Sequence, residues 1–130
     1  MSVPDLWPKL TPSNELTPLG ILRNHAARLF RKTNGLLEGD VVTEGIGTRF
    51  RHHFNITAPA LGHFTYELFF LEHGLESYPA RAHSANAEDN ISSEAELLEW
   101  IRNQMELQKP TLERLLNESM TDSMRAELVG

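Results

Sequence analysis

The chain has 130 residues, 40% of them hydrophobic, which suffices for one globular core without a metal or disulfide staple. It contains no cysteine, which excludes disulfides, thiolate catalysis and cysteine-type zinc sites. The net charge is −6, so nonspecific nucleic-acid binding is not expected, and no apolar run approaches the roughly 20 residues that span a bilayer. These features predict a soluble, acidic, single-domain protein.

Residues 1–16 have the composition of an extended arm. Three prolines favour extended or polyproline II backbone and remove backbone donors. The arm also carries Leu6, Trp7 and Leu10, and both a docked and an undocked arm stay open at this point. It lacks the basic and apolar regions of a secretory signal, so a cytoplasmic protein is the default prediction.

A single domain is predicted over residues 17–120, and it begins with a helix. Thr17 is a favourable N-cap, and Pro18 suits the first helical position, whose N–H is unpaired in any case. Asn34-Gly35 tolerates the left-handed conformation that ends many helices. The apolar stripe at helical spacing consists of Leu19, Leu22, Ala26, Leu29 and Phe30.

Three alternating strands follow between Leu36 and His73, because strand side chains have a period of two. Gly45-Ile46 is predicted to form the type II′ turn between the first two strands, since this turn needs glycine at its first central position. Residues 58–62 connect the second strand to the third. A short fourth strand, containing Pro79, is expected at the edge of the sheet, where the missing donor costs least.

This register predicts which side chains meet across the sheet. Asp40, Arg51 and Phe69 fall in one row, and His53 lies beside Glu67 in the next. Nearby carboxylates should raise the pKa of His53. The opposite face is predicted to pack against the helices and consists of Phe50, Phe54, Tyr66 and Phe70.

The C-terminal third is predicted to be helical after a polar loop at 84–90. Ser93 and Glu96 form a capping box that begins a second helix, and Pro110 is expected to break it, leaving a last short helix to Met120. A frayed tail is expected over residues 121–130. The predicted fold is therefore α+β: an N-terminal helix, a four-stranded antiparallel meander and two C-terminal helices on one sheet face.

Histidines are the candidate chemical groups. His53, His63 and His73 share one predicted face, but they are separated by much more than the roughly 2 Å metal–ligand distance allows, so no metal site and no cofactor is predicted. His52 is the polar residue on the apolar face. It is interpreted mainly as a packed histidine bonded to Tyr66, Tyr78 or a carbonyl, with a catalytic or ligand pocket at these three residues as the alternative.

The leading interpretation is a non-catalytic protein-binding module, because no nucleotide-binding, metal-binding or nucleophile motif is present. The architecture has a general likeness, without a shared motif, to small secretion-chaperone and toxin-neutralising domains. The partner is expected to be a protein, and a basic one given the acidic charge. A homodimer formed by two outer sheet faces is a further alternative. The predicted binding surface consists of Asp40, Arg49, Arg51, His53, Glu67, Phe69 and Leu71.

Overall fold

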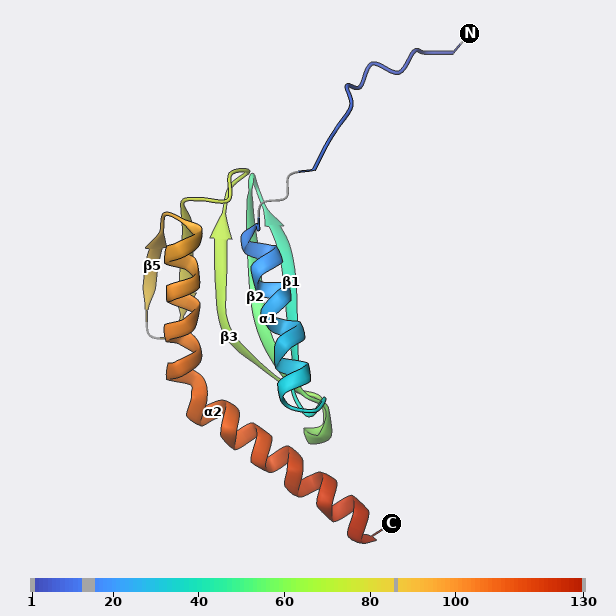
Figure 1. Cartoon of the computed structure of the whole chain (residues 1–130), viewed down its shortest axis with the longest axis vertical. Helices are drawn as coiled ribbons and strands as arrows, with labels where there is room; N and C mark the ends of the chain where they lie inside the picture. Colours follow the sequence, from blue (N-terminus) through green and yellow to red (C-terminus); the bar gives the residue numbers. More distant parts are fainter. Residues whose placement is uncertain (1, 13–15, 86, 130) are drawn as a thin grey trace.

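The computed structural model describes residues 2–12, 16–85 and 87–129, with the backbone alone for 122–129. Helix α1 (Pro18–Lys32) comes first in the chain, an antiparallel sheet follows it, and the long helix α2 (Glu94–Val129) comes last (Figure 1). The five strands are neighbours in chain order: β1 (Glu38–Ile46), β2 (Arg49–Ala58), β3 (Phe64–His73), β4 (Ala80–Ser84) and β5 (Glu88–Ile91). A short 3-10 helix, η1 (Pro59–Leu61), connects β2 to β3.

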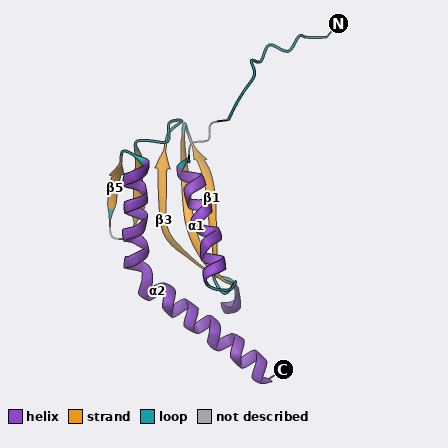
Figure 2. Ribbon diagram, viewed as in Figure 1, coloured by secondary structure: helices purple, strands orange, loops and turns teal. Residues whose placement is uncertain are grey.

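Both helices lie on the same face of this sheet, α1 over β1 and β2 and the first half of α2 toward β5 (Figure 2). The α+β class and the antiparallel meander are thus confirmed. The details differ from the prediction by one additional strand and by one continuous C-terminal helix where two were expected.

Helix α1 begins and ends where the sequence predicts. The Thr17 side chain accepts a hydrogen bond from the Gly20 N–H at 3.1 Å, and Pro18 occupies the first helical position. At the other end Asn34 and Gly35 adopt positive φ angles of 51° and 80°. Local interactions thus set both ends of the helix. Its buried side, which includes Leu22, faces the sheet.

The β1–β2 hairpin turns two residues later than predicted. Ile46 pairs with Arg49, and the turn is Gly47-Thr48, with Gly47 at φ +61°. Both Gly-X sites satisfy the type II′ requirement, so the turn rule could not choose between them. The shift by two residues keeps the faces of β1 but changes its partners, so that Glu44 and not Asp40 lies opposite Arg51.

A β-bulge in β3 reverses the predicted facing of its second half. The β2–β3 register shifts between Phe54 and Asn55, which leaves Leu68 as the extra residue. Phe69 and Leu71 therefore lie in the core with exposures of 2% and 0%, and the prediction that they face outward is wrong. Phe70, predicted to face the helices, lies on the outer face for the same reason.

The physical gain from the bulge is apolar burial. It lets the consecutive residues Leu68 and Phe69 both contact the core. The Phe69 ring stacks on Phe54 with 5.3 Å between centroids, and it meets the edge of Trp100 at 4.9 Å. These aromatic contacts add to the burial of both rings.

Strand β4 is an interior strand, because β5 pairs with its other side. The predictions of an edge strand here and of a polar loop at 84–90 are therefore wrong. Pro79 precedes the first strand residue, so it removes no donor from the ladder. The polar strand β5 is anchored by buried Ile91 and by the Trp100 indole N–H, which donates to Asp89 at 2.9 Å.

Helix α2 starts at the predicted capping box and passes through Pro110 without ending. The Glu96 N–H donates to the Ser93 hydroxyl at 3.2 Å, while the Glu96 carboxylate accepts from the Ser92 N–H at 2.7 Å. Pro110 lies inside the helix, which changes direction part-way along its length (Figure 1). A bend is the usual response to the lost hydrogen bond and the ring clash of an internal proline. The helix continues to Val129, and fraying of residues 121–130 stays a prediction.

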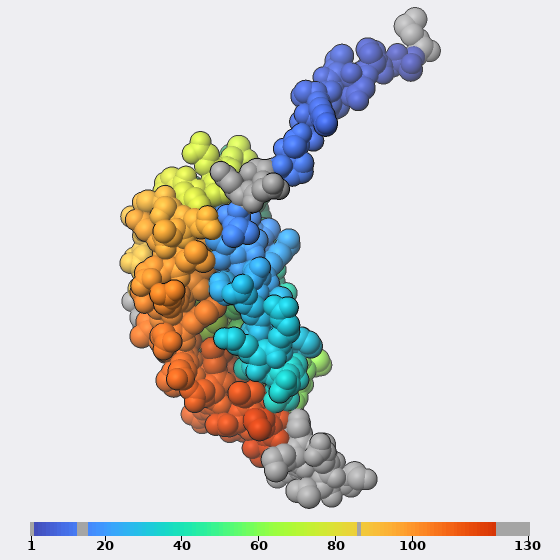
Figure 3. Space-filling view, viewed as in Figure 1, coloured from blue at the N-terminus to red at the C-terminus, as the bar shows by residue number. Residues whose placement is uncertain are grey.

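The N-terminal arm projects away from the body (Figure 3). Its large apolar side chains have no cover within the described chain, and Trp7 is 79% exposed. The docked alternative for Leu6, Trp7 and Leu10 is therefore not what this single copy adopts.

Gly39 provides a test of the packing between α1 and β1. A Cβ at this position would lie 2.6 Å from the Cα of Ala26, a backbone atom that cannot rotate away. We expect Gly39→Ala to lower the free energy of unfolding by about 2 kcal/mol, as overpacked cores do. Urea denaturation measures this, with Gly45→Ala as the control because a Cβ there meets nothing within 4 Å. Equal stabilities of the two variants would contradict the close approach.

Candidate functional site

The sheet face turned away from the helices carries two adjacent rows of side chains. They follow from the strand register, because residues directly opposite each other share a face. The first row contains Glu44, Arg51, Glu72 and Arg81. The second row contains Val42, His53, Phe70, His83 and Glu88. We call these two rows the outer-face rows.

A cluster of ion pairs occupies the first outer-face row. Glu72 bonds Arg49 Nε at 3.1 Å and an Arg51 terminal nitrogen at 3.3 Å, and Arg51 lies 3.9 Å from Glu44. Burial alone would raise the pKa of Glu72, but the hydrogen bonds and charges of the two arginines lower it. Glu72 thus fixes both guanidinium groups against the sheet.

Phe70 is the aromatic centre of the second row. The Arg51 guanidinium lies over its ring at 4.8 Å, the His83 ring stacks on it at 4.4 Å, and the His53 ring is tilted against it at 5.4 Å. A cation over an aromatic face is a favourable electrostatic contact. Phe70 could not be predicted as a surface residue from alternation, because only the bulge turns it outward.

His53 lies between two carboxylates. Its Nε2 is 2.7 Å from Glu44, and its Nδ1 bonds Glu67. Partial burial acts to lower the pKa of His53, but the hydrogen bonds to Glu67 and Glu44 outweigh it, so the pKa is raised. The predicted contact between His53 and Glu67 is confirmed.

The predicted binding residues separate into two groups. Arg49, Arg51, His53 and Glu67 come together on the outer face, as their contacts above show. Asp40 is exposed on β1 and lies opposite Asn55, so the predicted row of Asp40, Arg51 and Phe69 does not form. Phe69 and Leu71 belong to the core.

His52 is part of a hydrogen-bonded chain across three strands, in which His52 and His73 are buried and Thr43 is exposed. Its Nδ1 is 2.8 Å from the Thr43 hydroxyl, its Nε2 is 2.7 Å from His73 Nε2, and His73 Nδ1 is 2.7 Å from the Gly74 carbonyl. The carbonyl only accepts, so His73 Nδ1–H donates to it and His73 Nε2 accepts from His52. The Thr43 hydroxyl then donates to His52 Nδ1.

This chain replaces the pocket that the sequence offered as an alternative at His52, Tyr66 and Tyr78. The His52 side chain is 2% exposed, and the Tyr66 hydroxyl instead donates to Gln108 at 3.2 Å. The Tyr78 hydroxyl is buried, which raises its pKa together with the charge of Glu94. His52 is therefore a packed histidine whose partners are Thr43 and His73.

No metal-binding arrangement stands out among the described residues. In that part of the chain, no group of three or more His, Asp or Glu side chains is placed to hold a metal ion. His63 occupies the tight turn before β3 with φ +58°, far along the strand from His73. None of the described helices has the length and apolar character needed to cross a membrane.

Comparison with known proteins adds no family to this description. No family model matches the chain, and no curated protein or solved structure matches it at a significant level. The function must therefore be argued from the outer-face rows and their chemistry.

The pKa of His52 gives a test of this hydrogen-bonded chain. Burial, with smaller contributions from His73, Arg23 and His53, lowers this pKa from 6.5 to about 4. The unfolded state then takes up the proton first, so the free energy of unfolding should fall as the pH drops from about 6.5 to about 4, by on the order of 3 kcal/mol.

His52→Phe should remove this part of the pH dependence, as followed by urea denaturation across that range. His63→Asn is the control, because it replaces an exposed imidazole and asparagine tolerates the positive φ. The same pH slope in wild type and His52→Phe would refute the assignment.

His53 should titrate in the opposite sense. Its raised pKa means that protonated His53 stabilises the fold below the ordinary histidine pKa, and that this stabilisation is lost as the pH rises through the folded-state pKa. An NMR titration should give His53 a pKa above 6.5, and Glu67→Gln should lower it. A His53 pKa below the ordinary value would show that the carboxylates do not hold the imidazole.

Proposed function

We propose that the protein is a non-catalytic protein-binding module that engages a basic partner through the outer-face rows. The main support is Phe70, an aromatic residue on an open sheet face with Arg51 over its ring. Aromatic residues and arginine are the types that most often carry binding energy at protein interfaces. Two histidines flank Phe70 and keep its ring in one position.

Charge supports a basic partner. The arginines of this face are already paired, Arg49 and Arg51 with Glu72 and Arg81 with Glu88. By contrast, Glu38 and Asp40 at the β1 end take part in no ion pair among the described side chains. The arginines are thus neutralised internally, and the charge left for a partner is negative.

The geometry also favours binding over catalysis. His52 and His73 use all four ring nitrogens within their hydrogen-bonded chain, and His53 is held as an imidazolium-type partner of two carboxylates. The hydroxyl beside His52, that of Thr43, is itself a member of this hydrogen-bonded chain. His52 is buried, which argues against the alternative of a ligand pocket or active site at this residue. Phe69 and Leu71 are buried as well, so a sheet-to-sheet homodimer could not use them as its interface.

The test uses neighbouring phenylalanines that face opposite ways. We expect Phe70→Ala combined with Arg51→Ala to leave the fold intact and to abolish capture of the partner from a lysate of the native organism. Arg102→Ala on α2 is the matched control for loss of an arginine, because Arg102 lies away from the sheet in an exposed pair with Glu99. Capture by wild type should weaken at high salt, as expected for charge attraction.

Circular dichroism checks the fold of each variant. Phe69→Ala should lower stability by about 3 to 5 kcal/mol, since it removes a core aromatic ring. Recovery of the same captured proteins by wild type and by the Phe70/Arg51 double variant would show that the partner binds elsewhere.

A further inference from the structure

The edge of the sheet at β1 has unpaired backbone groups. β1 is the first strand of the sheet, and no described strand pairs with its outer side. A two-residue hairpin closes on a hydrogen-bonded pair, here Ile46 and Arg49, and bonding alternates from there. The odd-numbered residues of β1 therefore direct their N–H and C=O groups toward the open edge. A nine-residue edge of this kind is a template for another strand.

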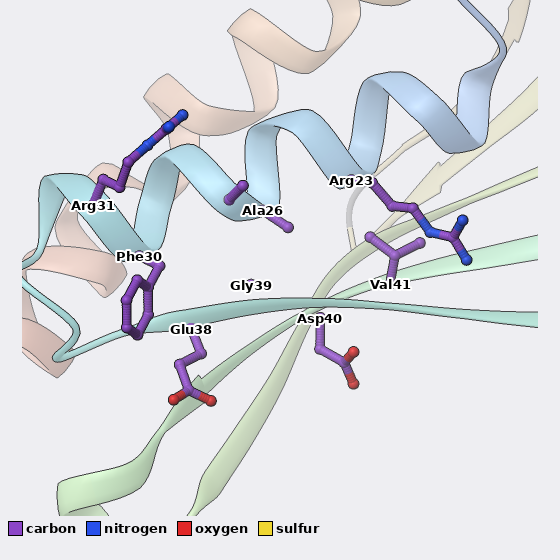
Figure 4. A pocket seen from close by; sticks show the side chains of 9 residues that line it. Arg23, Ala26, Phe30, Arg31, Glu38, Gly39, Asp40 and Val41 are labelled. Atoms are coloured by element: carbon purple, nitrogen blue, oxygen red, sulfur yellow. The ribbon is translucent and has the colours of Figure 1, made fainter.

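A groove runs along this edge between β1 and α1, with a volume of about 710 Å³ (Figure 4). Its floor is formed by small or apolar residues, including Ala26, Ala27 and Val41. Arg23 lies at one end, and Phe30 with Glu38 lies at the other. Arg31 lies at the Phe30 end and Asp40 at the Arg23 end, so each end of the groove carries one arginine and one acidic residue.

The N-terminal arm has the sequence of a strand that can pair on one side only. Pro4, Pro8 and Pro12 all have even numbers, so all three can point their missing donors away from a neighbouring strand. The odd-numbered residues keep their N–H groups for pairing. Eleven extended residues, 2–12, span about 36 Å, and β1 spans about 30 Å.

The same parity decides which arm side chains enter the groove. Residues that pair directly across an antiparallel ladder have their side chains on the same face. The odd residues of β1 face α1, as Thr43 does through its bond to buried His52. The odd residues of an added arm, Asp5, Trp7 and Lys9, would therefore face the groove.

The strand-pairing preference of this sheet favours one direction of the arm. With Trp7 at the middle of the groove, an antiparallel arm brings Asp5 to the Arg23 end and Lys9 to the end with Phe30 and Glu38. A parallel arm would bring Lys9 to the Arg23 end. Antiparallel ladders are slightly more stable per residue than parallel ones, and every pair of described strands in this sheet is antiparallel. Antiparallel pairing is therefore favoured.

The chain's own arm cannot adopt this direction. It enters α1 at Thr17, next to the Arg23 end of the groove, and so can return along β1 only as a parallel strand. An antiparallel arm must come from another molecule. In the single copy the Trp7 side chain is exposed, and the Trp7 backbone N–H donates to the Asp5 carboxylate of the same arm at 3.0 Å.

We propose that the arm of a second copy of this chain adds antiparallel to the edge of β1 and inserts Trp7 into the groove between β1 and α1. Each copy has one arm and one groove, so reciprocal exchange gives a closed, two-fold dimer. The indole occupies the apolar part of the groove beside Ala26, Ala27 and Val41, and the backbone of the arm satisfies the open edge. This inference is independent of the partner bound by the outer-face rows.

Light scattering on the full chain over a range of concentrations tests the proposal. The wild type should be a dimer, and Trp7→Ala should weaken dimerisation by about thirtyfold or more, the size of a tryptophan hot spot. Leu10→Ala is the matched control, because it removes an apolar side chain of the other parity, and it should change dimerisation by less than about threefold. A monomeric wild type, or equal losses in the two variants, would overturn the proposal.

A charge exchange tests the direction. Asp5→Lys and Arg23→Glu should each weaken the dimer, and the two together should restore it. Arg28→Glu is the control on the same helix, since Arg28 lies outside the groove. Failure of the double variant to recover would refute antiparallel docking.

Mixing distinguishes a second copy from the chain's own arm. Trp7→Ala keeps its groove, and Ala27→Arg keeps its arm but has the groove filled at an exposed helix position. Each variant alone should be monomeric, and the mixture should form heterodimers with one intact contact. If the mixture stays monomeric, the arm does not exchange between copies.

Discussion

The bulge at Leu68 is the constraint on which the two faces of this sheet depend. Without it, the strict alternation of β3 would bury Phe70 and expose Phe69 and Leu71. With it, Phe69 packs against Phe54 and Trp100 in the core, and the Phe70 ring lies under the Arg51 guanidinium group on the outer face. One additional residue therefore supplies both the aromatic centre of the core and the aromatic centre of the outer face.

The second organising contact is the approach of α1 to β1 at Gly39. The missing side chain lets the Ala26 backbone lie close to the strand, so α1 is drawn over the edge of the sheet and not over its middle. That placement leaves room along the outer side of β1, where the groove forms. The same glycine that tightens the core thus shapes the surface beside it.

Much of the fold could be predicted because local rules decided it. The caps of α1 and the capping box of α2 are set by a few neighbouring residues, and the period of two assigned β2 its faces correctly. The turn at Gly47-Thr48 was missed because Gly45-Ile46 satisfies the same turn rule. Only contacts made across the sheet, such as Glu44 with Arg51, distinguish the two positions.

The outer-face site was only partly predictable, for a related reason. The run Leu68 to Leu71 is apolar at every position, so alternation gives no information about which residue is the extra one. The same bulge turns His73 toward the face of His52, so the hydrogen bond between these two side chains was not predicted either. Strand β5 was missed because its acidic and amide residues disfavour strands, and its anchoring by Trp100 comes from a distant helix.

The chain from Thr43 through the two histidines to Gly74 also divides the sheet along its length. It ties β1, β2 and β3 together at one level by side-chain bonds, in addition to the backbone ladder. Beyond that level, Gly45, Ile46 and the Gly47-Thr48 turn are exposed, and a Cβ at Gly45 or Gly47 would meet nothing within 4 Å. The tip of the hairpin is thus free to open as a small local unit, with rapid amide exchange, while the strands below the histidines remain closed.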